Sequence, residues 1–364
     1  MPRALLVFHR WLALTIGALL ILIALSGAIV VFEGPLATAN ATHVAVGARP
    51  LSLDTLAARA VAAAGGGTVN AISPGRAPNE AFGFSVANGS VGQDLLVDPY
   101  TGAVLGPVPG PSRMQRIVSR IHQLHSSLLS GRPGQVIVSL VTLGSLLLVL
   151  SGLVLWWRER AWRVRWSASW KRIVYDLHHA LGIVSAVFLI VIMSTGVWIG
   201  FSKQINPLLQ RLDDPPQVAR APEQPAPPPG ATPISLDSIA RSAHSVAPDA
   251  PIVLMLLPPK GAAQIALRYP EDRTPGGRSR AVIDRYRGTV LWSSITRTAG
   301  TGTRLIDLQR AVHTGDIFGP VTQIVWFLVS IILASQVVTG VLMWWNGRKG
   351  RAVRRGDRAG ATAR

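Results

Sequence analysis

The chain has 364 residues, with 36 Lys and Arg against 18 Asp and Glu, so its formal net charge is +18, and 49% of it is hydrophobic. This apolar content excludes an intrinsically disordered chain, and a nucleic-acid-binding protein of such basicity rarely has only 15% charged residues. The chain has no cysteine, which excludes disulfides, iron–sulfur clusters, thiolate nucleophiles and cysteine zinc sites. Any metal or haem must therefore be held by His, Met, Tyr or carboxylate side chains.

Four stretches carry no charge and are long enough to cross a bilayer, which takes about 20 helical residues. They are Leu12–Phe32, Gln135–Trp157, Ala180–Phe201 and Ile317–Trp345. Such segments span lipid only as helices, because a helix satisfies its own backbone hydrogen bonds. The alternative for the first stretch is a signal peptide cleaved at Ala37-Thr38-Ala39, but the stretch is longer than the usual apolar core of about 7–15 residues.

Positive charge is concentrated between and beyond these spans. The N-terminal residues, the segment 158–177 and the tail after Trp345 together hold fifteen basic residues against three acidic ones. Short loops with such an excess stay on the cytoplasmic side. We therefore predict that both termini and the middle loop are cytoplasmic, that the two long segments between spans are periplasmic, and that the basicity does not indicate nucleic acid.

The chain resembles itself, which predicts a tandem duplication. The segment 50–57 matches 233–240, and the turn Asp98-Pro99-Tyr100-Thr101-Gly102 matches Asp284-Arg285-Tyr286-Arg287-Gly288. Around the spans, His125, Gly131 and Gly152 align with His313, Gly319 and Gly340, and His9, Ser26 and Gly27 align with His178, Thr195 and Gly196. One unit is a helix, an outer α/β segment and a helix, and it occurs twice in the same orientation, as in other membrane proteins with parallel repeats.

Each outer segment reads as a small α+β module. In the first, Leu51–Ala64 is an amphipathic helix with Ser52 as its N-cap, and the strands are Ala81–Ala87 and Asp94–Val97. In the second, the strands are Ile252–Leu257, Gln264–Arg268 and Ala281–Asp284. The proline-rich segment Asp213–Pro233 is a stiff tether between the third span and the second module.

The predicted fold is therefore a four-helix transmembrane bundle with two periplasmic α+β modules. Its parts are transmembrane helix 1 at 8–32, module 1 at 33–112, an interfacial segment with helix 2 at 113–157, a basic loop at 158–177, helix 3 at 178–202, a linker at 203–233, module 2 at 234–300, an interfacial segment with helix 4 at 301–345, and a basic tail at 346–364.

Six of the eight histidines cluster at the ends of the spans, where ionisable groups are costly and point to function. By the repeat, His9 pairs with His178 on the cytoplasmic side and His125 with His313 on the outer side. Imidazoles from facing bundle helices are a common way to hold a cofactor such as b-type haem. Because Pro133 and Pro320 mark the first turns of spans two and four, we expect His125 and His313 on short preceding helices at the outer interface.

Other readings of these histidines stay open. Zinc takes three or four ligands, more than two imidazoles supply, and the imidazoles could also be polar anchors at the membrane interface. His122 and His179 have no repeat partner and are second choices as ligands. The glycines at equivalent depth, Gly27, Gly152, Gly196 and Gly340, suit either close helix packing or room for a flat macrocycle.

The cytoplasmic segments are too short for a dinucleotide-binding domain, and the chain has no Gly-rich phosphate loop, Ser-His-Asp arrangement or HExxH helix. The protein therefore cannot bind NAD(P)H by itself. We expect its electrons to come from a lipid quinol or a partner reductase.

The spans and turns together resemble the PepSY-associated transmembrane helix family, which includes iron-regulated proteins and ferric-siderophore reductases of the bacterial inner membrane. The motifs that carry the resemblance are His9-Arg10-Trp11, Leu124-His125 with Gly131, Ser151 to Trp157, Asp176-Leu177-His178 with Gly182, and Val312-His313-Thr314-Gly315 with Gly319. Ala13 departs from the family, which more often has Gly there. The resemblance implies a four-span bundle, periplasmic PepSY modules and, in reductase members, b-type haems.

The resulting hypothesis is an inner-membrane electron-transfer protein with two b-type haems that reduces ferric-siderophore iron at the periplasmic side. His9 and His178 would ligate one haem and His125 and His313 the other, and arginines near the outer pair would either contact lipid phosphates or suit an anionic chelate. They are Arg113, Arg116, Arg120 and Arg304. The alternative is a non-enzymatic membrane protein whose PepSY modules bind or inhibit peptidases or sense envelope partners, and a metal or chelate transporter is a third reading.

Overall fold

The computed structural model describes residues 2–34, 41–89, 91–213, 223–274 and 276–361, and it describes no side chains for residues 2, 159 or 349–361. The chain divides into two compact units. The helical unit comprises the described residues of 1–33, 112–205 and 309–364, and the sheet unit those of 34–111 and 206–308. The signal-peptide cleavage site considered above and residues 214–222 of the predicted tether lie outside the described residues.

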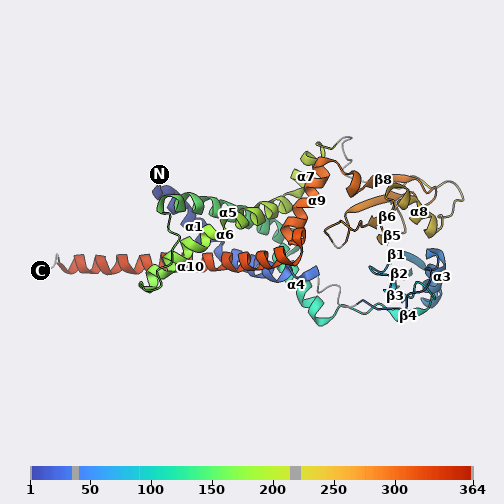
Figure 1. The fold of residues 1–364 in the computed structure, drawn as a ribbon, viewed down its shortest axis with the longest axis horizontal. Helices are drawn as coiled ribbons and strands as arrows, with labels where there is room; N and C mark the ends of the chain where they lie inside the picture. The colour runs from blue at the N-terminus through green and yellow to red at the C-terminus, as the bar shows by residue number, and fades with distance from the viewer. Residues whose placement is uncertain (1, 35–40, 90, 214–222, 275, 362–364) are drawn as a thin grey trace. The chain divides into compact units, whose positions relative to one another are not determined.

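Four long helices build the helical unit: α1 (Pro2–Val30), α5 (Gly131–Glu159), α6 (Trp170–Gly200) and α10 (Pro320–Ala361). Each contains a stretch of at least 28 residues that is long and apolar enough to cross a membrane, so the four predicted spans are confirmed at this level. α1 packs against α5 and α10, and α6 packs against the same two helices, so the four form a closed bundle (Figure 1). The helices are longer than the charge-free stretches because they continue into the polar flanks.

Two shorter helices come before the second and fourth spans. α4 (Arg113–Ser127) precedes α5, and α9 (Thr301–Thr314) precedes α10. Ser112 caps α4 through a reciprocal capping box with Gln115, and α4 ends where Leu128 takes a left-handed backbone with φ of 48°. α9 ends at Thr314, and the next residue, Gly315, has a φ of 81° that suits glycine and leads into the short turn η2 (Asp316–Phe318). α7 (Ser202–Gln210) follows α6.

Apolar side chains from all four long helices fill the centre of the bundle. Leu20 and Ile23 of α1, Leu148 of α5, Leu189 of α6 and Trp326 of α10 belong to one buried cluster. Trp326 also donates its indole hydrogen bond to the carbonyl of Val312, at 2.6 Å, and thereby ties α10 to the last turn of α9.

The sheet unit holds one antiparallel sheet of eight strands in the order β4-β3-β2-β1-β5-β6-β7-β8. The strands are β1 (Thr68–Ser73), β2 (Phe82–Asn88), β3 (Val91–Val97), β4 (Val104–Pro107), β5 (Ile252–Leu256), β6 (Ala263–Leu267), β7 (Ser279–Ile283) and β8 (Val290–Ser294). Helices α3 (Leu53–Ala63) and α8 (Leu236–Val246) share one buried core with the strands, so they cover the same face.

Several details differ from the sequence prediction. α3 begins at Leu53, two residues later than predicted, because Ser52 is its N-cap and accepts the hydrogen bond of Thr55 N. Strands β1, β4 and β8 were not predicted, since none shows a clean alternation of apolar and polar residues. β1 and β5 pair directly, through Ala71 with Leu256 and Ile72 with Met255, so the two predicted modules share one sheet.

Candidate functional site

The structure gathers the six span-end histidines at two ends of the helical unit. His9 lies near the start of α1, and His178 and His179 near the start of α6, where His9 interacts electrostatically with both. At the other end, His125 lies on α4 and His313 on α9, as expected for short helices before the spans. The rings of His125 and His313 have centroids 6.5 Å apart and planes inclined by 36°.

Each of the four repeat-related imidazoles lies directly against a glycine of a neighbouring span. A Cβ on Gly27 would come within 2.8 Å of the His125 ring, and one on Gly196 within 3.2 Å of the His313 ring. The corresponding distances are 3.2 Å from Gly152 to His9 and 3.5 Å from Gly340 to His178. Gly27, Gly152 and Gly196 therefore make room for the imidazoles, a role that neither of the sequence readings assigned to them, whereas a Cβ on Gly340 would be in ordinary contact with its ring.

The residue before each glycine carries a hydroxyl, and three of these hydroxyls bind the imidazole directly. The Nδ1 atom of His9 lies 2.9 Å from Ser151 Oγ, that of His178 2.9 Å from Thr339 Oγ1, and that of His313 3.0 Å from Thr195 Oγ1. In the fourth case the Nδ1 atom of His125 lies 2.9 Å from the carbonyl oxygen of Ile23, one turn before Ser26. All four rings are thus held through the same nitrogen.

These bonds decide which ring nitrogen carries the proton. The Ile23 carbonyl can only accept, so Nδ1 of His125 must be the donor. The Ser151 hydroxyl donates to the Leu148 carbonyl, and the Thr339 and Thr195 hydroxyls donate to carbonyls one turn earlier in their own helices. Each hydroxyl therefore has only a lone pair left for the imidazole, so Nδ1 donates to it. In the neutral ring Nε2 is then unprotonated and has a lone pair for a ligand.

Burial keeps the pair on α4 and α9 neutral. It lowers the pKa of His125 and lowers that of His313 to about 4, and the imidazole of His122 acts in the same direction on His125, as that of His125 does on His313. A neutral imidazole is the form that binds a metal ion. The pair is therefore in its ligating form at physiological pH without any need to release a proton.

The spacing of this pair fits one metal ion between two imidazoles. Two rings that bind an ion from opposite sides through bonds of about 2 Å have nitrogens about 4 Å apart and centroids roughly 6 Å apart. The observed 6.5 Å agrees with that arrangement. Among the described residues no group of three or more His, Asp or Glu side chains could hold a bare metal ion. The two imidazoles would therefore suit haem iron, whose other ligands the porphyrin supplies.

The two second-choice histidines are held differently. His179 bonds through Nδ1 to the carbonyl of Tyr175 in its own helix and stacks on the Tyr175 ring with centroids 4.1 Å apart. His122 forms an ion pair with Glu33 at the surface, where both side chains are more than a third exposed. Neither lies against a hydroxyl–glycine pair among the described residues, which favours His178 and His125 over them.

Sequence reasoning missed the hydroxyl–glycine pair as part of the site. The signal was present, because each span contains a Ser-Gly or Thr-Gly dipeptide: Ser26-Gly27, Ser151-Gly152, Thr195-Gly196 and Thr339-Gly340. What the sequence could not supply is which dipeptide faces which histidine. In the structure α1 faces α4, α5 faces α1, α6 faces α9 and α10 faces α6.

Comparison with known proteins agrees with this architecture. The sequence profile of the family described as "PepSY-associated TM region" matches residues 6–347. No curated protein matches the chain. Because the profile covers nearly the whole chain, including all four long apolar helices, the protein belongs to the PepSY-associated TM family.

Proposed function

We propose that the protein is an inner-membrane electron carrier that holds two b-type haems and passes electrons to ferric iron chelated by a siderophore on the periplasmic side. His9 and His178 would hold one haem and His125 and His313 the other. The observation that carries the proposal is the fourfold arrangement in which Nδ1 of each imidazole donates to a neighbouring helix and Nε2 keeps its lone pair.

Each part of the site has a role in the proposed electron transfer. Haem bound at such a pair accepts and donates one electron at a time. The hydroxyls and the Ile23 carbonyl fix the tautomer and the orientation of the rings, and acceptors of this kind make an imidazole a better donor to iron. Gly27, Gly152 and Gly196 leave the space in which three of the rings lie. Reduction to the ferrous state weakens the hold of a hard-oxygen chelator on iron, so release needs no hydrolysis.

The order of the elements supports a duplicated origin. A long helix, a short helix, four strands, a second short helix and another long helix occur in the same order in each half, and α7 follows α6 in the second. We infer a tandem duplication from this order and from the equivalent contacts of the four imidazoles. The positive-inside rule places both termini and the loop between α5 and α6 in the cytoplasm. Electrons would enter near His9 and His178 from a quinol or a partner reductase and leave near His125 and His313.

The test is the absorption spectrum of the purified protein. The dithionite-reduced minus oxidised spectrum should show b-type haem bands, and the haem content should be two per chain. Replacing His9 or His178 by Ala should remove one haem, and replacing His125 or His313 the other. Each double variant within a pair should lose no more haem than either of its single variants, because one missing ligand already disables the site.

His122→Ala and His179→Ala are the matched controls, since each removes an imidazole next to a proposed ligand and should keep both haems. Protein without haem bands would overturn the proposal and leave the peptidase-binding or sensing alternative. Full haem content in all four single variants would refute the ligand assignment and transfer it to His122 and His179.

A further inference from the structure

The sheet unit contains a cavity that the proposed electron transfer does not use. Its volume is about 700 Å³, within the range of about 300–1,000 Å³ that is usual for small-molecule sites. Its lining includes Lys260, Gln264, Ile265, Arg280, Val282 and Trp292. Every lining residue belongs to the sheet unit.

The cavity lies on the face of the sheet that α3 and α8 do not cover. In β7, Ser279, Ala281 and Ile283 are fully buried on the helix side. Because side chains alternate along a strand, Arg280 and Val282 face the opposite side. Val282 pairs with Gln264 of β6 and with Trp292 of β8, so these three side chains form one row across the sheet.

Arg280 is the unusual member of this lining. Its guanidinium is partly buried and donates to the backbone carbonyl of Ser279 at 2.9 Å. No described carboxylate lies within ion-pair distance of it, whereas Arg278, Arg287 and Arg297 of the same unit all have one. Burial lowers the pKa of Arg280 and the nearby Arg278 acts in the same direction, whereas Asp307 and Asp272, beyond ion-pair distance, act in the opposite one. A partly buried charge of this kind is stabilised by a partner of opposite charge.

The other residues that line the cavity indicate which chemical groups that partner carries besides its charge. Lys260 adds a second cation against the single carboxylate of Glu223. Val282 and Pro258 provide apolar walls, and Trp292 provides a broad aromatic surface. The amides of Gln224 and Gln264 are the other polar groups.

We propose that this cavity binds a small organic carboxylate that carries a flat apolar ring system. Arg280 takes the carboxylate, and the ring lies against Trp292 and Val282. The inference does not depend on haem, because all of its residues lie in the sheet unit.

The experiment measures binding of 2-naphthoate to the full-length protein in lipid nanodiscs by isothermal titration calorimetry, with 2-naphthamide as the uncharged comparator. We expect naphthoate to bind at one site per chain and naphthamide at least tenfold more weakly. Arg280→Gln should weaken naphthoate binding at least tenfold, because hydrogen bonds to charged groups contribute the most, whereas Arg280→Lys should retain part of the affinity. Trp292→Leu should weaken naphthoate as well.

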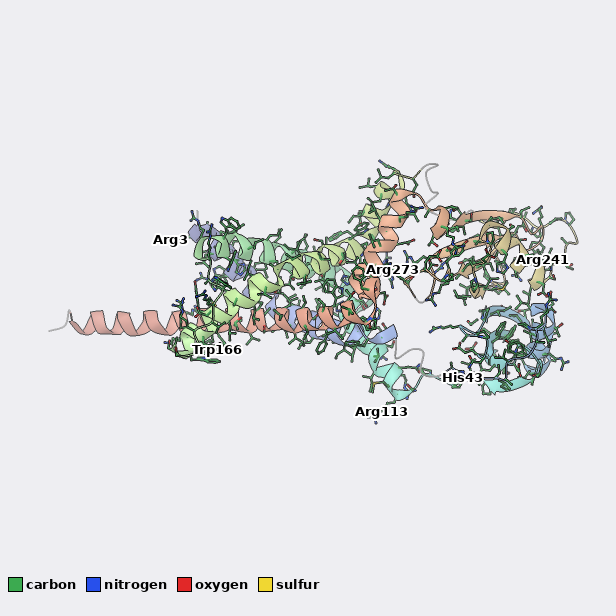
Figure 2. All side chains as sticks on the ribbon, viewed as in Figure 1. Arg3, His43, Arg113, Trp166, Arg241 and Arg273 are labelled. Carbon is green, nitrogen blue, oxygen red and sulfur yellow. The ribbon has the colours of Figure 1, made fainter. Side chains whose placement is uncertain are left out.

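Arg241→Gln is the matched control, since Arg241 lies on α8, over the other face of the sheet (Figure 2). It should bind naphthoate as the unmodified protein does, and circular dichroism should show all variants folded. Equal binding of the two probes, no binding of naphthoate, or full affinity in Arg280→Gln would overturn the assignment. A peptide with a free carboxyl terminus that binds more tightly than naphthoate would assign the cavity to a peptide instead and refute the small-molecule proposal.

Discussion

A single hydroxyl next to a glycine is the smallest element that the four imidazole contacts share. In three of the four contacts the glycine removes a Cβ that would crowd the ring, and the Ser or Thr oxygen, or the carbonyl one turn earlier, accepts the Nδ1 proton. Helical Ser and Thr hydroxyls commonly bond to a carbonyl one turn earlier. Here that local bond has a further effect, because it orients the hydroxyl lone pair toward another helix.

Thr339 tests this acceptor without changing the shape of the site. Thr339→Val keeps the branched side chain but removes the oxygen that accepts from His178 Nδ1. If His178 holds haem, the affinity of that site should fall roughly tenfold, since loss of a hydrogen bond that orients a ligand typically costs 10–100-fold. Titration of haem into the haem-free protein measures it. Thr15→Val, which removes a hydroxyl bonded only to the Trp11 carbonyl, should change nothing.

Gln336 breaks the symmetry between the halves. By the repeat it corresponds to Leu148, and the backbone carbonyls of these two residues take equivalent positions beside His178 and His9. The Nε2 atom of Gln336 is buried and has no partner among the described residues. A buried donor without a partner costs about 1–3 kcal/mol.

Gln336→Leu should therefore raise the thermal midpoint of the bundle by a few degrees, because leucine fills a similar volume and has no unpaired group. Tryptophan fluorescence during heating reports the change, since ten of the eleven tryptophans lie in the helical unit. A lower midpoint would show that the amide has a partner in the folded protein. Leu148→Gln, the reverse change in the other half, should lower the midpoint.

At the scale of elements, α3 and α8 cap each other. The Asp237 carboxylate accepts from the backbone N–H groups of Leu53 and Asp54 at 3.0 and 3.2 Å, and the Asp54 carboxylate accepts from those of Leu236 and Asp237 at 2.8 and 3.3 Å. The first N–H groups of a helix have no partner within it. Each carboxylate thus satisfies the start of a helix that lies more than 180 residues away in the sequence.

This reciprocal capping predicts that a substitution in one helix weakens the first turn of the other. Asp237→Ala should speed amide hydrogen exchange at the start of α3, and Asp54→Ala at the start of α8, each about tenfold, because losing such a cap costs about 1–2 kcal/mol. Mass spectrometry of peptides covering 51–58 and 234–241 measures both. Asp94→Ala, at an exposed position in β3, is the control. Changes confined to the mutated helix would contradict the reciprocal arrangement.

The Asp237 carboxylate also makes the stability of the start of α3 depend on pH. Burial alone would raise the pKa of Asp237, but hydrogen bonds from its neighbours hold it below its usual value. A lowered pKa contributes stability above the unfolded value, and that contribution is lost as the pH falls below about 4. Exchange at the start of α3 should therefore accelerate on acidification below that pH, after correction for the intrinsic exchange rate, and Asp237→Ala should abolish the dependence.

The elements differ in how far the sequence predicts them. The spans follow from apolar runs longer than about 20 residues, which few other structures accommodate. Turns such as Asp98 to Gly102 follow from local chemistry, since Asp98 accepts from the N–H groups of Tyr100 and Thr101. Pairing of β1 with β5, the capping of α3 by Asp237 and the choice of glycine for each imidazole are long-range. They depend on contacts that leave no local periodicity.

For the whole molecule, the distribution of charge determines the orientation in the membrane. Arg3 and Trp166 lie at one end of the bundle and Arg113 at the other (Figure 2). The basic loop is fixed there by the fully buried Asp176, which binds Arg165 and Arg172. Reporter fusions after residue 165 or at the C-terminus should behave as cytoplasmic, and fusions near residues 75 or 225 as periplasmic. A periplasmic C-terminus would refute the charge argument and the direction of electron transfer.

The proposed electron acceptor is ferric iron bound by a siderophore. In the proposed orientation His125 and His313 would lie toward the periplasm, and α4 presents Arg113, Arg116 and Arg120 as exposed cations on the same helix as His125. Guanidinium groups suit an anionic chelate. Protein reduced chemically in detergent, without oxygen, should therefore be reoxidised by a ferric siderophore, and a ferrous chelator should trap one iron for each electron lost.

Charge reversal on α4 separates recognition from electron transfer. Arg113→Glu with Arg120→Glu should slow reoxidation by anionic ferric chelates and leave reoxidation by an uncharged one unchanged, because only the electrostatic attraction is altered. The same double change to Lys keeps the charge and should retain most of the rate. If the reduced spectrum persists with hydroxamate, catecholate and simple ferric chelates alike, the protein does not reduce chelated iron, whether or not it binds haem.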